Sequence, residues 1–258
     1  MMTANLAQMG PAQVTVVDIN GKSCIRKQGA SPVELNFYQF SAPQLDGVNT
    51  PRLLDVKGDD LYIEYIPNTI TLDELLAQNL TFEQLARIHQ SDFQPTHPLK
   101  QHHWTESNTD LALNSLNLPQ ITNDSLRTIQ HLSQDLFSSQ RLVSGDTNQG
   151  NWGIKHNGEL VLFDWERFGF GSPAIDLAPL IKGLGSLDDY EWMVGQYTLY
   201  NPQVSGHMLV KQLILAKAWL IIEVTNILVG RNNPHKVKCI HWYQQHIPQW
   251  LAKVEKGL

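Results

Sequence analysis

Apolar and polar residues alternate along the first part of the chain in the manner of β-strands. Over residues 14–28 the pattern has a period of two, and Asn20-Gly21 interrupts it with residues that favour a two-residue hairpin turn. Two further apolar runs, RLLDVKG and DLYIEYI, flank the turn residues Gly58-Asp59-Asp60. Between the two pairs, Ser31-Pro32 supplies a cap and a first helical proline for a short helix over 32–40. The pattern therefore predicts two antiparallel hairpins and one helix.

Near residue 68 the pattern changes to a helical one. The segments TLDELLAQ and TFEQLARIHQS each begin with a threonine that is followed three residues later by Glu or Gln, which is the spacing of a capping box. Residues 93–123 have weak periodicity and are predicted as loop with one short helix, whereas 124–138 are predicted as a helix. Three short apolar strands follow, RLVSGD, NWGIKH and ELVLFDW, and then three or four helices that end at 235–254.

This order of elements predicts an α+β fold. A small lobe of antiparallel strands, 1–67, precedes a larger and mainly helical lobe, 68–258. The most apolar stretch, 209–229, is interrupted by three charged residues, so it is predicted as a buried helix and not as a membrane span. The amino-terminal segment lacks the charged start and the continuous apolar run of a secretory signal.

Composition narrows the class of protein. With 258 residues, of which 42% are hydrophobic and 17% charged, the chain can bury a core, which argues against disorder. A net charge of −6 without a dense Lys/Arg stripe excludes nucleic-acid binding by phosphate neutralisation, and an acidic surface tolerates a cationic ligand. Cys24 and Cys239 are too few and too far apart for a disulfide framework or a zinc site, which favours the cytoplasm.

The candidate chemistry lies in the stretch LVSGDTNQGNWGIKHNGELVLFDWERFGFGSPAIDLA. Asp146 and Asn151 lie in a loop between apolar strands, and Asp164 follows a second strand after a hairpin. Taken alone, an Asp-x4-Asn loop is more often a turn closed by side-chain caps. Together, the three side chains bring two carboxylates and an amide oxygen to one point, and Mg²⁺ prefers such hard oxygen ligands.

The same stretch resembles the catalytic core of the aminoglycoside phosphotransferase, choline kinase and thiamine kinase family, whose pattern is roughly HGDxxxxN, a hairpin and [IF]D[WF]E. The match consists of Gly145-Asp146, Asn151 and the run Phe163-Asp164-Trp165-Glu166. The resemblance implies a bilobal, protein-kinase-like fold in which Asp146 is the catalytic base and Asn151 and Asp164 hold the magnesium ions on the ATP phosphates. It also implies that Asp176 braces the catalytic loop from the next helix.

The amino-terminal half matches the family in the same order, so that the resemblance covers roughly residues 14–180. It implies that Lys27 contacts the nucleotide phosphates and pairs with Glu34, and that main-chain groups near Glu64 and Ile66 bind the adenine at the hinge between the lobes. Simpler interpretations remain, because Lys27 also suits a solvated strand edge, Glu34 a helix first turn and Glu64 a water-facing position.

The chain departs from the family pattern at three places. Ser144 stands where the family usually has His, and Asn148 stands where many members have a second His. Nothing Gly-rich precedes Lys27; Gly10 lies before the first strand, and the Asn20-Gly21 turn is the candidate for a short phosphate loop.

The resemblance implies an enzyme that uses ATP and Mg²⁺ to phosphorylate a hydroxyl group of a small molecule, such as an amino sugar, choline or a thiamine-like compound. Acidic residues such as Glu166 and Asp188-Asp189 are candidates to meet a cationic acceptor. The alternative is a catalytically silent member of the fold that binds nucleotide or acts as a scaffold, and a purely structural helical domain ranks last. His102-His103 lack metal-ligand spacing, and Trp242, Tyr243 and Trp250 are predicted as core residues.

Overall fold

The computed structural model describes residues 12–19 and 21–258, which form two compact units. The first unit contains the chain up to Gln101 together with Leu142–Gly169, and the second contains His102–Arg141 and Phe170–Leu258. The predicted lobe boundary divides the chain at a single point, after residue 67. The compact units divide it differently, because residues 142–169 belong to the same unit as the amino-terminal sheet. The division of nucleotide and acceptor binding between two lobes stays a prediction. Gly10 and Asn20 lie outside the described residues.

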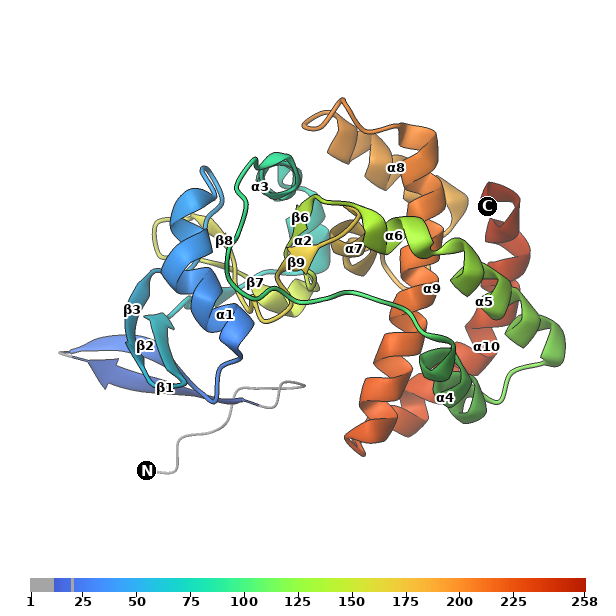
Figure 1. The fold of residues 1–258 in the computed structure, drawn as a ribbon, viewed down its shortest axis with the longest axis horizontal. Helices are drawn as coiled ribbons and strands as arrows, with labels where there is room; N and C mark the ends of the chain where they lie inside the picture. The colour runs from blue at the N-terminus through green and yellow to red at the C-terminus, as the bar shows by residue number, and fades with distance from the viewer. Residues whose placement is uncertain (1–11, 20) are drawn as a thin grey trace. The chain divides into compact units, whose positions relative to one another are not determined.

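A four-stranded antiparallel sheet forms the amino-terminal part of the first unit (Figure 1). Its strands are β1 (Gln13–Ile19), β2 (Lys22–Gln28), β3 (Leu53–Lys57) and β4 (Asp60–Glu64), in the order β1-β2-β4-β3. Both predicted hairpins are thus confirmed. Gly21 adopts the positive φ of 77° that the tight turn requires. Lys27 lies in an inner strand, paired with Val14 on one side and Leu61 on the other.

The predicted helix over 32–40 is present in two parts. α1 (Pro32–Asn36) begins at Ser31, whose hydroxyl accepts a hydrogen bond from the Glu34 amide at 3.2 Å, and a π-helical turn continues it over Phe37–Ser41. The Phe37 ring is fully buried and stacks on Trp165, with ring centroids 3.9 Å apart and planes inclined by 8°. This stack attaches the helix that carries Glu34 to the segment that carries Asp164.

A second, smaller sheet of the first unit has the strand order β5-β7-β8. It consists of β5 (Asn68–Thr69), β7 (Trp152–Ile154) and β8 (Leu160–Leu162). Helix α2 (Leu72–Leu76) begins with the predicted capping box of Thr71 and Glu74. Two short strands, β6 (Leu142–Val143) and β9 (Gly169–Phe170), lie before and after the candidate site along the chain.

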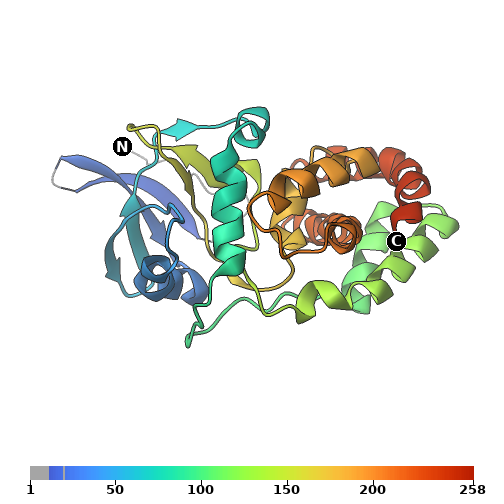
Figure 2. The same cartoon turned by 90° about the horizontal axis from the view of Figure 1, so that it is seen from above.

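The second predicted capping box, at Thr81, is wrong. Helix α3 (Asn79–Gln90) has Gln78 as its cap, so Thr81 lies inside the helix and donates its hydroxyl to the Leu75 carbonyl at 2.7 Å. The side chain of Gln84, fully buried, crosses to the smaller sheet and donates to the carbonyl of Leu160 at 3.2 Å. Figure 2 shows α3, in teal, beside these strands. A tertiary contact therefore replaces the local cap.

The second unit is helical. Its helices are α4 (Glu106–Leu116), α5 (Gln120–Leu132), α6 (Gln134–Ser138), α7 (Ala174–Leu177), α8 (Leu187–Thr198), α9 (Gly206–Gly230) and α10 (Lys236–Val254). α4 is the short helix predicted within 93–123, and the predicted helix over 124–138 consists of α5 and α6, beginning earlier than predicted.

Helix α9 is central to the second unit and packs against α4, α5, α7, α8 and α10. By length and composition it is the one helix in the described ranges that is apolar enough to cross a bilayer, and 61% of its most apolar window is buried inside the protein. The prediction of a buried helix over 209–229 is confirmed by this packing.

Lys217 lies on α9 with only 5% of its surface exposed. Its ammonium donates hydrogen bonds to the carbonyls of Ala178 and Ile181 at 2.7 and 2.9 Å. Burial lowers the pKa of Lys217 from 10.5 to about 7, because an ammonium is poorly solvated in this interior. The unfolded chain therefore binds this proton at a higher pH than the folded protein does.

This difference predicts a pH dependence of stability. Where the unfolded state binds more protons, the free energy of unfolding rises with pH, so the contribution of Lys217 is lost as the pH falls from about 10 to about 7. As the pH falls through this range, the free energy of unfolding should fall more steeply for the unaltered protein than for Lys217→Met. The difference in slope should be at most about 1.4 kcal/mol per pH unit. Urea unfolding of both proteins across this range tests the prediction, with Lys211→Met on the same helix as control. Parallel profiles would contradict it.

Candidate active site

The loop that is predicted to be catalytic begins after β6 with Gly145, whose φ of 82° is in the left-handed region that favours glycine. The Asn148 side chain donates to the Asp146 carboxylate at 2.7 Å, and the Asn151 side chain donates to the Asp146 carbonyl at 2.9 Å. The indole of Trp152 donates to the carbonyl of Thr147 at 3.0 Å. The predicted Asp146–Asn151 loop is thus closed by its own side chains and anchored to β7.

Burial raises the pKa of Asp146, since the carboxylate loses water around it. The hydrogen bond from Asn148 and the charge of Arg167 act in the opposite direction. Arg167 also donates from Nε to the Gly145 carbonyl at 3.0 Å. Asn148, which stands where many family members have a second His, thus contacts the proposed base Asp146 directly.

Asp164 follows β8 and is held in an unusual backbone conformation. Its φ is 65°, the left-handed region that Asp and Asn tolerate better than other side chains, and such conformations concentrate at functional sites. On one side, the Phe163 amide donates to the Asn151 carbonyl at 2.9 Å. On the other, the buried indole of Trp165 donates to the Leu162 carbonyl at 3.1 Å and stacks on Phe37. The chain on both sides of Asp164 is therefore fixed.

Lys27 lies at the centre of a charged cluster, in which it faces three carboxylates. Its Nζ is 2.5 Å from Glu34 Oε2, 2.7 Å from Asp164 Oδ1 and 4.0 Å from Glu166 Oε2. The side chains of Lys27 and Glu34 are 8% and 1% exposed, whereas that of Asp164 is 38% exposed. The predicted pairing of Lys27 with Glu34 is present, and it is a buried ion pair rather than a solvated strand-edge charge.

The cluster carries an excess of negative charge, because one ammonium faces three carboxylates. Burial disfavours the charged Lys27, but the charges of Glu34 and Asp164 outweigh this and raise its pKa. Burial raises the pKa of Glu34, against the lowering effect of Lys27 and with a further increase from Asp164 and Glu166. A divalent cation at Asp164 would offset the repulsion among these carboxylates.

The donor set fits magnesium. Within the described part of the chain there is no group of three or more His, Cys, Asp or Glu side chains able to hold a metal ion. Mg²⁺ does not need one, since it is usually held by one or two carboxylates together with water and substrate phosphates. Asp164 offers a partly exposed carboxylate, and Asn151 has the donor end of its amide fixed by Asp146, which leaves the oxygen end as the ligand. These two residues would hold the ion.

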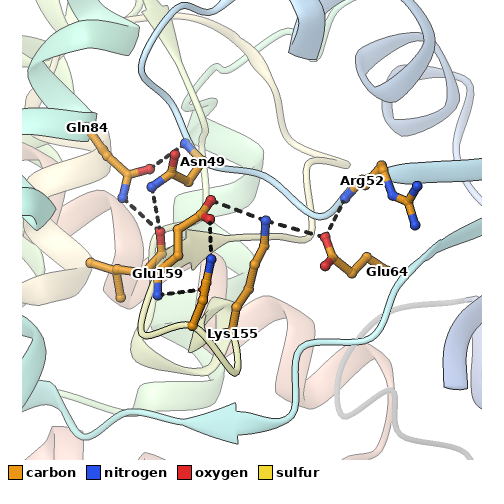
Figure 3. A network of polar contacts seen from close by, with 8 residues as sticks. Asn49, Arg52, Glu64, Gln84, Lys155 and Glu159 are labelled. Carbon is orange, nitrogen blue, oxygen red and sulfur yellow. Dashed lines mark hydrogen bonds and ion pairs between the residues drawn. The ribbon is translucent and has the colours of Figure 1, made fainter. Parts of the chain in front are cut away.

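The predicted hinge residues lie at the end of β4, of which Glu64 is the last residue, and Ile66 follows two residues later. The Glu64 carboxylate accepts a hydrogen bond from the Arg52 amide at 3.1 Å and lies 3.4 Å from Lys155 Nζ, so it is bound to protein and does not simply face water (Figure 3). The Glu64 amide donates to the Arg52 carbonyl at 2.9 Å. Within residues 12–19 and 21–258, by contrast, the main-chain groups of Ile66 form no hydrogen bond, which keeps them as candidates for binding a base.

The remaining predicted residues lie in the second unit. Asp176 is fully buried in the first turn of α7, and its role as a brace stays a prediction. The Asp189 carboxylate closes a capping box with Ser186 at the start of α8, which makes it a structural acid and not a free group for an acceptor. Trp250 is buried as predicted, but Trp242 is 36% exposed and stacks on His246, so its prediction as a core residue is wrong.

Sequence reasoning missed four contributions to the site. They are the hydrogen bond from Asn148 to Asp146, the contact of Arg167 with Gly145, the stack of Phe37 on Trp165, and the contact of Lys155 with Glu64. Only the first had a signal in the sequence, because Asn two residues after Asp in a loop is a common side-chain turn partner. The other three join residues that lie far apart along the chain.

Comparison with known proteins identifies the family of this chain. A family model described as "Phosphotransferase enzyme family" matches residues 16–202. Among solved structures, APH(2'')-IIa in complex with gentamicin has a TM-score of 0.64 at 16% identity, covering 91% of this chain and 88% of that one. Macrolide 2'-phosphotransferase MphH from Brachybacterium faecium has a TM-score of 0.64 at 11% identity, covering 92% and 89%.

A third structure is a ternary complex. It is a thermostable mutant of the aminoglycoside phosphotransferase APH(4)-Ia in a ternary complex with AMP-PNP and hygromycin B, with a TM-score of 0.63 at 14% identity, covering 97% of this chain and 93% of that one. At such identities the likeness establishes the fold, and the predicted kinase-like α+β fold is confirmed. Since the family model spans well over half of the sequence, this chain belongs to the phosphotransferase enzyme family.

Proposed function

We propose that this protein transfers the γ-phosphoryl group of ATP to a hydroxyl group of a small molecule, with Mg²⁺, in the cytoplasm. The observation that carries the proposal is the Lys27 cluster, in which one buried ammonium contacts both Glu34 and Asp164. An ammonium held in this way is ready to meet phosphate oxygens, and phosphoryl transfer depends mainly on such positioning and charge stabilisation. Family membership and the AMP-PNP complex of a fold neighbour support the use of a nucleotide.

Each residue has a defined task in this proposal. The Asp146 carboxylate, oriented by Asn148, accepts the proton of the acceptor hydroxyl. At the same time, the oxygen of that hydroxyl forms a bond to the γ-phosphorus. The bond from that phosphorus to the β–γ bridging oxygen breaks, and its electron pair leaves with ADP. Asn151 and Asp164 would hold Mg²⁺, which supplies positive charge to the phosphate oxygens. Lys27 binds phosphate, and the main chain of Ile66 binds the base.

The acceptor class is proposed as an amino sugar, choline or a thiamine-like alcohol. The fold neighbours in complex with gentamicin and hygromycin B support the first of these, and the net charge of −6 suits any cationic acceptor. The second candidate function is a catalytically silent nucleotide-binding protein. It is favoured by the short turn at Gly21, which stands where a Gly-rich phosphate loop would be expected.

An ATP-consumption screen with Mg²⁺ against aminoglycosides, amino alcohols, thiamine and sugars tests the proposal. Turnover with at least one acceptor is expected, and it should be lost in Asp146→Asn, in which the neutral amide cannot accept the proton. Asp92→Asn, at an exposed loop position, is the matched control for removal of one carboxylate. Turnover that survives Asp146→Asn would refute the assigned base. Stabilisation by Mg-ATP without turnover would favour the silent protein.

A further inference from the structure

The hinge segment of the first unit is attached at both of its ends to the hairpin formed by β7 and β8. At one end, Glu64 Oε2 lies 3.4 Å from Lys155 Nζ, and Lys155 is the residue that directly follows β7 (Figure 3). At the other end, Asn68 pairs with Ile154 in the small sheet and donates from its side chain to the Ile154 carbonyl at 3.1 Å. The intervening main chain therefore has little freedom to shift along the hairpin.

The same hairpin carries the proposed magnesium ligands. β7 begins directly after Asn151, and β8 ends two residues before Asp164. The base is proposed to bind at the main chain of Ile66. This main chain and the residues that meet the phosphates are thus attached to the same hairpin. Correct spacing between these two points matters, since a nucleotide must satisfy both at once.

Lys155 is held in place for such a role. Its side chain is 19% exposed, and its ammonium lies between Glu64 and Glu159, 3.2 Å from the latter. Its amide donates to the Glu159 carbonyl at 2.9 Å, and its carbonyl accepts from the Gly158 amide at 3.0 Å, which closes the hairpin turn. The Glu64 carboxylate is in turn fixed by the Arg52 amide. The ion pair thus joins the Lys155 ammonium to the Glu64 carboxylate, and the main chain of each residue is already held by hydrogen bonds.

We propose that Lys155 is a positioning residue for nucleotide binding, which fixes the hinge main chain through Glu64 relative to Asn151 and Asp164. This inference rests on the proposed function of the site. Lys155 acts through Glu64 and is not itself expected to touch the nucleotide. A partly exposed ion pair is worth at most about 1 kcal/mol, so its loss should weaken nucleotide binding by up to about fivefold.

Calorimetric titration of the full-length protein with Mg-ADP tests this proposal. Lys155→Met and Glu64→Gln should each weaken binding measurably, by up to about fivefold. The double variant should bind no more weakly than either single variant, because both changes remove the same contact. Lys155→Arg should restore most of the affinity. Lys57→Met removes a lysine that pairs with Asp55 at the surface and serves as the matched control, with unchanged binding.

The possible failures are distinguishable. If the unaltered protein does not bind Mg-ADP, the proposed function fails and the inference falls with it. If the unaltered protein binds and Lys155→Met binds equally well, only the inference is overturned. Additive losses in the double variant would also overturn it, as would a melting temperature of Lys155→Met, without nucleotide, far below that of Lys57→Met, because the effect would then be one of general stability.

Discussion

Asp164→Asn should lower the rate of phosphoryl transfer by about 100- to 1000-fold, since it removes the charge that is proposed to hold Mg²⁺ while leaving the side-chain shape intact. Asparagine is the appropriate substitute because Asp164 has a φ of 65°, which Asn adopts with little strain. Initial rates at saturating acceptor, together with Mg-ADP affinity by calorimetry, measure the effect. A rate within tenfold of that of the unaltered protein would contradict the assignment of Asp164 as a ligand.

Two further variants separate the effect of the Asp164 charge from the effect of backbone strain at this position. Asp164→Ala should lose activity similarly but also unfold more easily, by about 1–2 kcal/mol, because alanine lacks the polar side chain that tolerates a left-handed conformation. Asp92→Asn, in which an exposed aspartate outside the site loses its charge, should retain full activity. If Asp164→Asn and Asp92→Asn were equally active, the charge of Asp164 would not be needed for phosphoryl transfer.

Gly153→Ala should weaken Mg-ADP binding by about 10- to 100-fold and lower the free energy of unfolding by about 1–3 kcal/mol. A β-carbon at this buried position of β7 would lie 2.7 Å from Ile66 Cγ2 and 3.0 Å from the Asn68 carbonyl oxygen. Ile66 Cγ2 is a methyl group of a β-branched side chain that is stiff about χ1, and the Asn68 oxygen belongs to the main chain, so the main chain at these residues is expected to shift. Displacement of Ile66 relative to Asn151 and Asp164 is then expected to impair nucleotide binding.

Gly195→Ala is the matched control for this change. Gly195 is an exposed residue of α8, and a β-carbon there would meet nothing within 4 Å. Because alanine favours helix, this variant should be more stable by about 0.5–1 kcal/mol and should bind Mg-ADP normally. Urea unfolding and calorimetry of the two variants compare them directly. Equal binding by Gly153→Ala and Gly195→Ala would show that the close packing at Gly153 has no bearing on the nucleotide.

The close packing at Gly153 is a feature of the predicted hinge that the sequence did not indicate. The run DLYIEYI with the break at Pro67 predicted a strand that extends to Ile66, whereas β4 ends two residues earlier, at Glu64. The glycine that permits Ile66 to approach β7 lies about 90 residues further along the chain, and no local pattern connects the two. The same holds for Lys155, whose pairing with Glu64 is a contact between separate elements.

The helical part shows the limit of local signals in another way. Thr71 and Thr81 both begin a Thr-x-x-Glu/Gln run, yet only Thr71 caps a helix. Gln84, three residues after Thr81, is fully buried and accepts a hydrogen bond from the Asn49 amide at 2.7 Å while donating to the Leu160 carbonyl. A buried amide that satisfies two main-chain groups contributes more than a solvent-exposed cap, so the tertiary contact prevails.

By itself the sequence determined the two amino-terminal hairpins, the Asp146–Asn151 loop and the order of Lys27, Glu34 and Asp164, because periodicity, turn residues and motif spacing act over a few neighbouring positions. Only the tertiary structure decided that Lys27 is buried between Glu34 and Asp164, and that Phe37 stacks on Trp165 to fix both segments. The contact of Lys27 with Asp164 and the stack of Phe37 on Trp165 each join residues more than 100 positions apart along the chain. Those long-range contacts convert a set of matching motifs into a cluster in which one buried ammonium faces three carboxylates.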